Sequence, residues 1–229
     1  MIPQVTNDYI TAFTSDFELE PKSTALIIVD MQYASASRNK GLGKLLSEQG
    51  KSELAKYRFD RIEGVTVPTI KRLLSFFRKH QLSVIYLTMG SKSKDYCDAL
   101  PHLKALFQSS NNYLGSDEHR ILDEIQPQGE ELIVHKTTIG AFSSTNLDSI
   151  LWSRGLKYLL FTGVSTNMCV ETTARDAADR GFRCVLIEDG CGASDQSYHD
   201  AAMTTFQRLF GKVNTSEEVI AELTSKIES

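Results

Sequence analysis

The chain lacks the sequence features of secreted proteins, of proteins with structural zinc sites and of membrane proteins. Its 229 residues include only four cysteines, which form no CxxC pair and no cysteine–histidine ligand spacing. A disulfide framework or a structural metal site is therefore not expected. No apolar run approaches the ~20 residues that a membrane-spanning helix needs. The first residues also lack the basic and then apolar pattern of a secretory signal. We expect a cytoplasmic protein with no membrane partner, no metal and no cofactor.

A basic surplus is also missing. Lys and Arg total 25 against 29 Asp and Glu, and the formal net charge is −4. Because the chain also has no basic run, its composition does not favour binding to nucleic acid. The chain has no internal repeat, low-complexity segment or Pro/Ser-rich linker, and 41% of its residues are hydrophobic. We therefore predict one domain over 1–229, large enough to bury a substantial core.

Short apolar runs, rich in β-branched residues, recur along the chain. They lie at 23–30, 83–90, 131–136, 158–164 and 183–190, with a weaker run at 212–215. Nearly continuous apolar runs of this length are typical of strands buried on both faces of a parallel sheet. The pattern predicts a six-stranded, mostly parallel sheet.

The segments between these runs have the period of helices. Residues 67–80 place Ile70, Leu73, Leu74 and Phe77 on one stripe and basic side chains on the other. Similar patterns occur at 146–155, 168–181 and 197–211. Alternating strands and helices imply right-handed βαβ units, and so an α/β, doubly wound sheet with helices on both faces.

One connection is unusually long. Residues 31–60 separate the first predicted strand from the first long helix, and long connections in compact domains are usually functional or disordered. This one leaves the carboxyl end of a strand, where ligands bind in such sheets. We interpret it as a lid or a substrate-shaping loop, with an oligomer contact as the alternative.

Three chemically capable residues follow three different predicted strands. Asp30 ends the first, Lys136 ends the third, and Cys169 follows the fourth after a short turn. Each alone has an ordinary structural explanation: a helix cap, a lysine reaching solvent, or a small buried hydrophobe. Because the fold brings the carboxyl ends of strands to one crevice, the three together favour a catalytic site.

The residues around Cys169 favour a reactive thiol. Ser165, Thr166 and Asn167 are all residues that begin helices, so Cys169 is predicted in a first helical turn. There the helix dipole, free N–H groups and a nearby lysine would lower the thiol pKa from its usual ~8.5. The same N–H groups can hold a developing oxyanion.

These motifs resemble the isochorismatase-like cysteine hydrolases. The residues concerned are D-M-Q at 30–32, the lysine that ends the third strand, and G-V-S-T-N-M-C-V at 163–170; the likeness extends from Thr24 to Leu223. The resemblance implies an Asp30–Lys136–Cys169 triad and an oxyanion hole formed by Ser165 and Cys169. It also implies a non-proline cis peptide at Val164–Ser165. We further expect a homo-oligomer, a dimer or a tetramer.

The resemblance also implies a reaction. Cys169 would attack the carbonyl of a small amide, leaving a thioester that water hydrolyses. Nicotinamidases of this superfamily carry an Asp-x-His metal site after the second strand, whereas residues 88–98 (TMGSKSKDYCD) contain no histidine. The long loop and the segment after Lys136 look most like the biuret and ureidoacrylate branch. We expect a C–N amidohydrolase of linear amides or ureides.

Substrate contacts are predicted from residue type and position. Phe142 is a candidate pocket wall, and Gln32 and Gln207 are candidates for hydrogen bonds to a urea-like group, although surface polarity explains Gln207 better. His135 and His199 have no metal-ligand spacing and are interpreted as ordinary structural or surface histidines. The alternatives are an isochorismatase-type or nicotinamidase-type hydrolase, or a catalytically silent binding module of the same fold.

Overall fold

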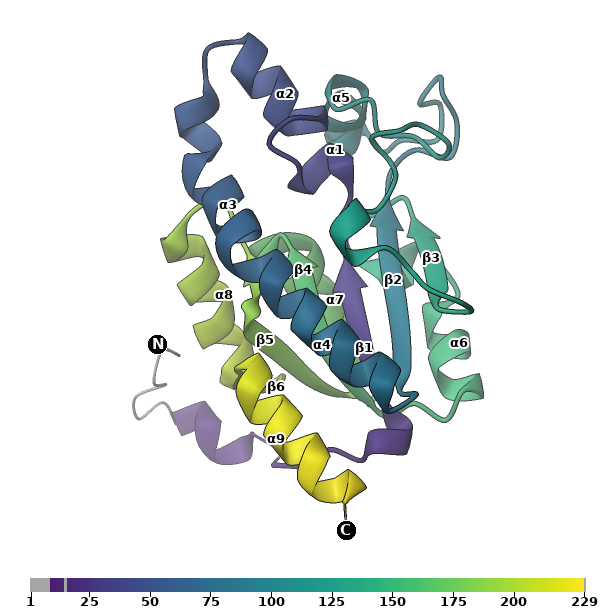
Figure 1. Cartoon of the computed structure of the whole chain (residues 1–229), viewed down its shortest axis with the longest axis vertical. Coiled ribbons are helices and arrows are strands. Elements are labelled where there is room, and N and C mark those ends of the chain that lie inside the picture. The colour runs from purple at the N-terminus through teal and green to yellow at the C-terminus, as the bar shows by residue number, and fades with distance from the viewer. Residues whose placement is uncertain (1–8, 15, 229) are drawn as a thin grey trace.

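A sheet of six parallel strands forms the centre of the molecule. The computed structural model describes residues 9–14 and 16–228 (Figure 1). The strands are β1 (Thr24–Val29), β2 (Ser83–Met89), β3 (Leu132–Lys136), β4 (Tyr158–Val164), β5 (Arg183–Gly192) and β6 (Gly211–Asn214). Their order across the sheet is β3-β2-β1-β4-β5-β6, and every neighbouring pair is parallel. The predicted doubly wound sheet is confirmed, with strand ends within two residues of those expected.

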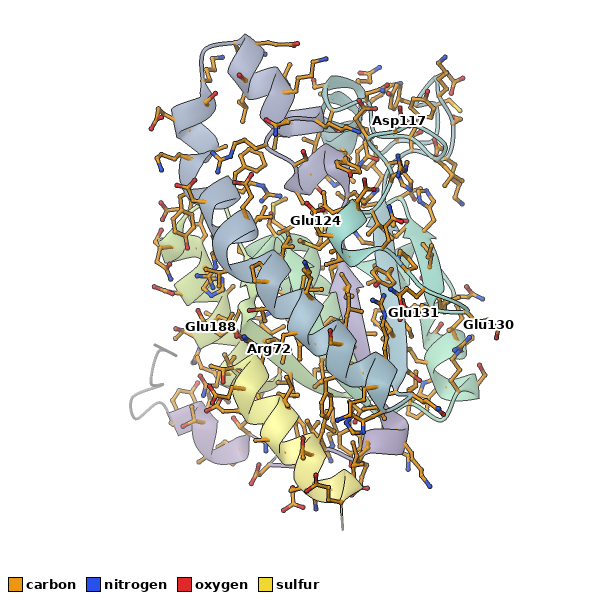
Figure 2. The ribbon with its side chains drawn as sticks, in the orientation of Figure 1. Arg72, Asp117, Glu124, Glu130, Glu131 and Glu188 are labelled. Carbon is orange, nitrogen blue, oxygen red and sulfur yellow. The ribbon has the colours of Figure 1, made fainter. Side chains whose placement is uncertain are left out.

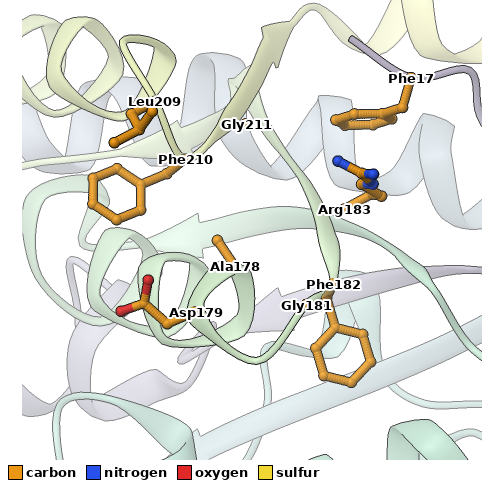
Figure 3. A pocket seen from close by; sticks show the side chains of 9 residues that line it. All are labelled: Phe17, Ala178, Asp179, Gly181, Phe182, Arg183, Leu209, Phe210 and Gly211. Carbon is orange, nitrogen blue, oxygen red and sulfur yellow. The ribbon is translucent and has the colours of Figure 1, made fainter. Parts of the chain in front are cut away.

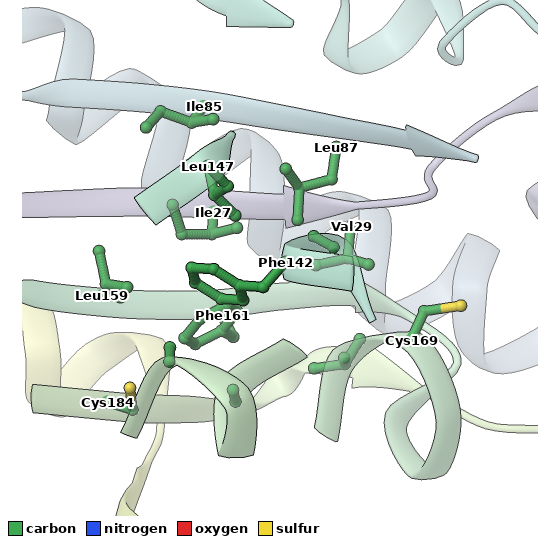
Figure 4. Packing of buried hydrophobic residues seen from close by; sticks show 14 of the residues in the cluster. Ile27, Val29, Ile85, Leu87, Phe142, Leu147, Leu159, Phe161, Cys169 and Cys184 are labelled. Atoms are coloured by element: carbon green, nitrogen blue, oxygen red, sulfur yellow. The ribbon is translucent and has the colours of Figure 1, made fainter. Parts of the chain in front are cut away.

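Helices cover both faces of this sheet. They are α1 (Tyr33–Ala36), α2 (Gly41–Glu48), α3 (Lys56–Arg61), α4 (Val67–Lys79), α5 (Pro101–Ser109), α6 (Leu147–Ser153), α7 (Glu171–Asp179), α8 (Gln196–Gln207) and α9 (Ser216–Ile227). Side chains alternate along β1: Ile27 and Val29 join a core with α5 to α8, and Leu26 and Ile28 join one with α3, α4 and α9. Figure 4 shows part of the first core. Both faces are thus buried, as the continuous apolar runs predict.

The long connection after β1 is largely helical. It carries α1, α2, a 3-10 turn (Ser52–Ala55) and α3. A π-helical turn (Ile62–Thr66) then joins α3 to α4, so that one helical stretch runs from the top of the molecule in Figure 1 across the front of the sheet. Whether this segment closes as a lid, and whether 1–229 acts as a single domain, stay predictions.

Helix α9 was not predicted, although the sequence carries its start signal. Thr215 and Glu218 form a capping box, in which each side chain bonds the other's backbone N–H. The Ser216 N–H also donates to Asp189 (2.8 Å), which pairs with Arg72 of α4 (3.0 Å). Figure 2 labels Arg72 where α4 passes the start of α9. Within 9–14 and 16–228, no helix has the length and apolar character needed to cross a bilayer.

Gly163 permits a close approach of β1 and β4. It adopts φ +106°, and a Cβ there would lie 2.1 Å from the carbonyl oxygen of Val29. Val29 and Gly163 are register partners immediately before Asp30 and the turn that holds Cys169. The glycine therefore allows the two strands to end side by side.

Replacing Gly163 with alanine should destabilise the fold. Positive φ costs ~1–2 kcal/mol and the overlap ~1–3 kcal/mol more, so we expect a loss of roughly 2–5 kcal/mol in urea-induced unfolding. Gly155 is the matched control, because it has φ +68° and no atom within 4 Å of the place where a Cβ would lie. Gly155→Ala should cost only the ~1–2 kcal/mol of backbone strain. Equal losses in the two variants would contradict this argument.

Candidate active site

Asp30, Lys136 and Cys169 meet at the carboxyl edge of the sheet. Asp30 follows β1 with φ +53°, a left-handed conformation that Asp tolerates better than most residues. Lys136 ends β3, and its Nζ donates to Asp30 Oδ2 (2.9 Å) and to the Thr138 carbonyl (3.1 Å). Cys169 lies in a π-helical turn, Thr166–Val170, that leads from β4 to α7. All three side chains are buried.

The thiol lies at the border between the core and a pocket. Figure 4 shows the Cys169 sulfur pointing away from the hydrophobic cluster. Its Sγ lies 3.8 Å from Met89 Sδ, and it interacts electrostatically with Asp30 and Lys136. Asp30 Oδ1, by contrast, is buried with no hydrogen-bond partner among the described residues. A carboxylate oxygen without a partner beside a thiol is a candidate proton acceptor.

The thiol is not the low-pKa group that its helical position suggested. Burial raises the pKa of Cys169 to about 12; the Asp30 charge adds to this effect, while Lys136 opposes it. The predicted depression of the Cys169 pKa is therefore wrong for this state of the site. The helix start was recognised correctly, but the sequence could not show that the thiol is buried against a carboxylate.

The Asp30–Lys136 pair responds to burial in two ways. Burial raises the pKa of Asp30, against the opposing effects of Lys136 and the Cys169 thiol. Burial would lower the pKa of Lys136, but the charges of Asp30 and Cys169 outweigh it and raise this pKa above its ordinary value. Lys136 thus stays an ammonium, and Asp30 becomes a stronger base than an exposed carboxylate.

The turn before Cys169 has the geometry that the resemblance implied. The Val164–Ser165 peptide is cis, which confirms that expectation. Ser165 precedes the helical turn, and Cys169 is the fourth residue of it. The first four N–H groups of a helix have no intrahelical acceptor. The role of the Ser165 and Cys169 backbone N–H groups as an oxyanion hole stays a prediction.

A buried polar network behind this turn was missed at the sequence level. The Nδ1 of His199 in α8 lies 2.9 Å from Thr166 Oγ1, and its Nε2 lies 3.0 Å from Arg61 and 3.2 Å from Glu188. The hydrogen bond to His199 is the main reason that the pKa of Glu188 falls to about 2. His199 is buried within this network, and no motif pointed to its partners.

A cavity of about 340 Å³ opens in front of Asp30 and Cys169. Asp30, Cys169 and Ser165 form its floor, together with Met89 and Val164. The wall contains Leu42, Leu46, Leu54, Ala55 and Arg58 from the segment after β1, and Leu106, Phe107 and Ile139 from elsewhere. The segment that was interpreted as substrate-shaping thus forms one side of the pocket. Arg58 was not predicted.

The three predicted substrate contacts do not line this cavity. The Gln32 amide donates to the His119 carbonyl (2.8 Å) and accepts from the Met89 N–H (2.7 Å). Both ends of the amide therefore already have partners at the end of β2. Phe142 lies in the core near Phe161 (Figure 4), and its ring stacks against Phe182. Gln207 is the last residue of α8, and none of the three is among the pocket-lining residues. As substrate contacts, all three stay predictions that this cavity does not support.

Another hollow, also about 340 Å³, lies at the opposite edge of the sheet. Phe17, Phe182, Arg183, Phe210 and Gly211 are among its lining residues (Figure 3). Arg183 and Gly211 begin β5 and β6, so this hollow is at the amino ends of the strands. Ligands of open α/β sheets bind at the carboxyl ends. The cavity beside Cys169 is the stronger candidate.

No metal cluster accompanies either hollow: within the described ranges, no three His, Cys, Asp or Glu side chains gather so that they could hold an ion. The fold and the ordered Asp, Lys and Cys residues define a parallel α/β protein with a buried thiol at its strand ends.

Comparison with known proteins identifies the family. Residues 24–218 match the model of the isochorismatase domain. Two curated relatives, each a ureidoacrylate amidohydrolase RutB, are 31% identical: that of Rhizobium rhizogenes covers 89% of this chain and 84% of its own, and that of Agrobacterium fabrum 86% and 88%. A solved cysteine hydrolase from Pseudomonas syringae pv. phaseolicola 1448A superposes with TM-score 0.75 at 24% identity, covering 93% of this chain and 98% of its own. The chain belongs to the isochorismatase family and is a hydrolase of it.

Proposed function

We propose that this enzyme is a cysteine-dependent amidohydrolase that cleaves a C–N bond of a linear amide or ureide. The observation that carries the proposal is the buried Lys136–Asp30 pair, 2.9 Å long, beside the Cys169 thiol at the floor of a cavity. A nucleophile, an adjacent base and a group that orients the base are the parts of nucleophilic catalysis. The curated relatives are amidohydrolases by name.

In the first half-reaction, Asp30 takes the thiol proton as Cys169 Sγ bonds to the substrate carbonyl carbon. Because the pKa of Cys169 is raised to about 12, the proton leaves as the bond forms rather than beforehand. The oxyanion is held by the Ser165 and Cys169 backbone N–H groups. The C–N bond then breaks, Asp30 returns the proton to the leaving nitrogen, and an acyl thioester remains.

In the second half-reaction, water takes the place of the amine. Asp30 accepts a proton from water, the resulting hydroxide attacks the thioester, and the C–S bond breaks. The departing sulfur recovers the proton from Asp30, which restores the starting enzyme. Lys136 stays charged throughout and keeps the Asp30 carboxylate oriented.

The relatives and the cavity support a substrate class. A ureidoacrylate-type ureide has a carbon chain that can lie against Leu42, Leu46 and Leu54. Biuret consists almost wholly of polar groups, which this wall would leave without hydrogen bonds. We therefore place ureidoacrylate-type ureides ahead of biuret.

A panel of substrates tests this function. The purified enzyme is offered ureidoacrylate-type ureides, biuret, nicotinamide, a simple aliphatic amide and isochorismate, and ammonia or pyruvate release is followed. We expect ammonia from the ureides, unchanged by a chelator. Loss of nicotinamide hydrolysis on chelation and recovery with zinc would favour a nicotinamidase, and pyruvate release alone an isochorismatase. No turnover of any amide would favour a silent binding module.

A further inference from the structure

Arg58 is a buried cation on the wall of the catalytic cavity. It lies in α3, its exposed fraction is 7%, and it lines the cavity with Asp30 and Cys169. Its charge interacts with both of these residues. Burial lowers its pKa to about 10, so the guanidinium remains charged at neutral pH.

The hydrogen bonds of Arg58 leave part of its donor capacity unused. Its Nε and Nη2 donate to the Ser35 carbonyl (3.2 and 2.8 Å), and its Nη1 donates to Ser165 Oγ (2.7 Å). A guanidinium has five N–H groups in a planar fork. One N–H on each terminal nitrogen is therefore left as a donor for an anionic ligand.

Arg58 also has no acidic partner in the described part of the chain, where no carboxylate oxygen lies within 4.0 Å of it. Arg61, one turn further along the same helical stretch, is paired with Glu188 at 3.0 Å. Asp30 is already paired with Lys136. With Cys169 as a neutral thiol, the two cations and one carboxylate leave the site with one positive charge in excess.

The surroundings increase the cost of that charge. Leucines and other apolar side chains form most of the remaining wall: Leu42, Leu46, Leu54, Ala55, Leu106, Phe107 and Ile139. A buried cation in apolar surroundings is costly unless an anion pairs with it. A ligand that supplies an anion and a hydrocarbon segment would satisfy both the guanidinium and this wall.

We propose that Arg58 binds a carboxylate of the substrate, so that the enzyme selects amides or ureides carrying a carboxylate and a short hydrocarbon segment. The proposal rests on the proposed function, because it assumes that an amide carbonyl sits at Cys169. Arg58 then fixes the far end of the substrate while Cys169 attacks the other. Its contact with Ser165 Oγ ties this anion site to the turn that carries the oxyanion donors.

The decisive measurement compares a charged substrate with its uncharged analogue. A ureido acid and the matching methylamide are assayed with wild type, Arg58→Gln, Arg58→Lys and Lys56→Gln. We expect wild type to prefer the acid, and Arg58→Gln to reduce the acid-to-amide ratio of kcat/KM by about 10²-fold, mainly through KM. Arg58→Lys should keep part of the preference, since it retains the charge but not the fork.

Lys56→Gln is the matched control. It removes one positive charge from the same helix, but its side chain is 58% exposed and pairs with Asp60 outside the cavity. The acid-to-amide ratio should not change. If Arg58→Gln lowers kcat/KM equally for both substrates, the loss comes from the contact with Ser165 and the oxyanion site. An equal loss with no change in the ratio would overturn the proposal, as would a wild-type enzyme without preference for the acid.

A binding experiment separates this proposal from the proposed function. Cys169→Ser, with and without Arg58→Gln, is titrated calorimetrically with butyrate, which offers a carboxylate and hydrocarbon but no scissile bond. We expect binding that Arg58→Gln weakens at least tenfold. Binding of this kind by an enzyme that hydrolyses no amide would support the anion site and overturn the proposed function. Amide hydrolysis by an enzyme whose butyrate binding does not depend on Arg58 would support the proposed function and overturn the anion site. If Arg58→Gln is insoluble, Arg58→Lys takes its place, and an unchanged acid-to-amide ratio with unchanged butyrate binding in that variant would overturn the proposal.

Discussion

Cys169→Ser should abolish turnover while leaving the fold intact. Cys169 supplies the sulfur that becomes the acyl carrier, and the hydroxyl is a far weaker nucleophile in this setting. Losses of nucleophiles in comparable triads reduce kcat by roughly 10⁴-fold or more. Because Ser is smaller and the site is already polar on one side, the unfolding midpoint should move little. Steady-state kinetics and thermal unfolding measure the two effects.

Cys97→Ser is the control for this experiment. Cys97 is an exposed free cysteine and should be dispensable for activity. Intact-protein mass spectrometry of wild type quenched in acid during turnover should show the acyl adduct, and peptide mapping should place it on Cys169. Residual activity above ~10% in Cys169→Ser, or an adduct elsewhere, would refute the proposed nucleophile.

Asp30→Asn should remove activity and stability together. Loss of a general base typically costs 10²–10⁴-fold in rate. The same change leaves the fully buried Lys136 ammonium without its carboxylate partner. Breaking a buried ion pair in this way typically costs about 3–5 kcal/mol of stability. Unfolding in urea and kcat measure the two losses separately.

The stability loss in Asp30→Asn should depend on pH. In wild type, the pKa of Lys136 is raised by Asp30 and Cys169 against burial; this stabilisation is present below the unfolded pKa and is lost as the pH rises through the folded pKa. Without Asp30, burial prevails and the pKa of Lys136 falls below its unfolded value. The variant then gains stability as the pH rises toward ~10. Its deficit relative to wild type should therefore be smaller at pH 9.5 than at pH 7.

The combined variant Asp30→Asn with Lys136→Met separates structure from catalysis. Removing both charges of a buried pair is often nearly neutral for stability, so at least half of the lost free energy of unfolding should return. Activity should not return, because the base is still absent. Recovery of activity, or a double variant as unstable as Asp30→Asn, would contradict the roles assigned to the pair.

The strands and the meeting of the three site residues could be predicted because they depend on local pattern and topology. Continuous apolar runs place Asp30, Lys136 and Cys169 at strand ends, and parallel order brings strand ends together. The start of α9 was also available, in the Thr215–Glu218 capping box. What remained hidden depended on partners remote in sequence.

Gln32 illustrates the difference. Its amide looked suited to a ureide, yet its partner His119 lies 87 residues away, and no spacing rule connects the two. Phe142 was predicted as a pocket wall, but its ring stacks against Phe182 in the core. Arg58 was overlooked because it lies in a segment interpreted as a loop. The pKa of Cys169 was misjudged because helix position is visible in sequence, whereas depth of burial is not.

The strand order also sets a length requirement at position 136. Strand β2 lies between β1 and β3, and neighbouring strands are about 4.8 Å apart, so the backbones that carry Asp30 and Lys136 are separated by roughly 10 Å. A side chain that bridges them must pass over the end of β2 and still end in a donor. Lysine is a long, slender chain with a compact head, whereas arginine would bring a planar fork with more N–H groups than this buried gap can satisfy. The site therefore demands reach as well as charge from its basic residue.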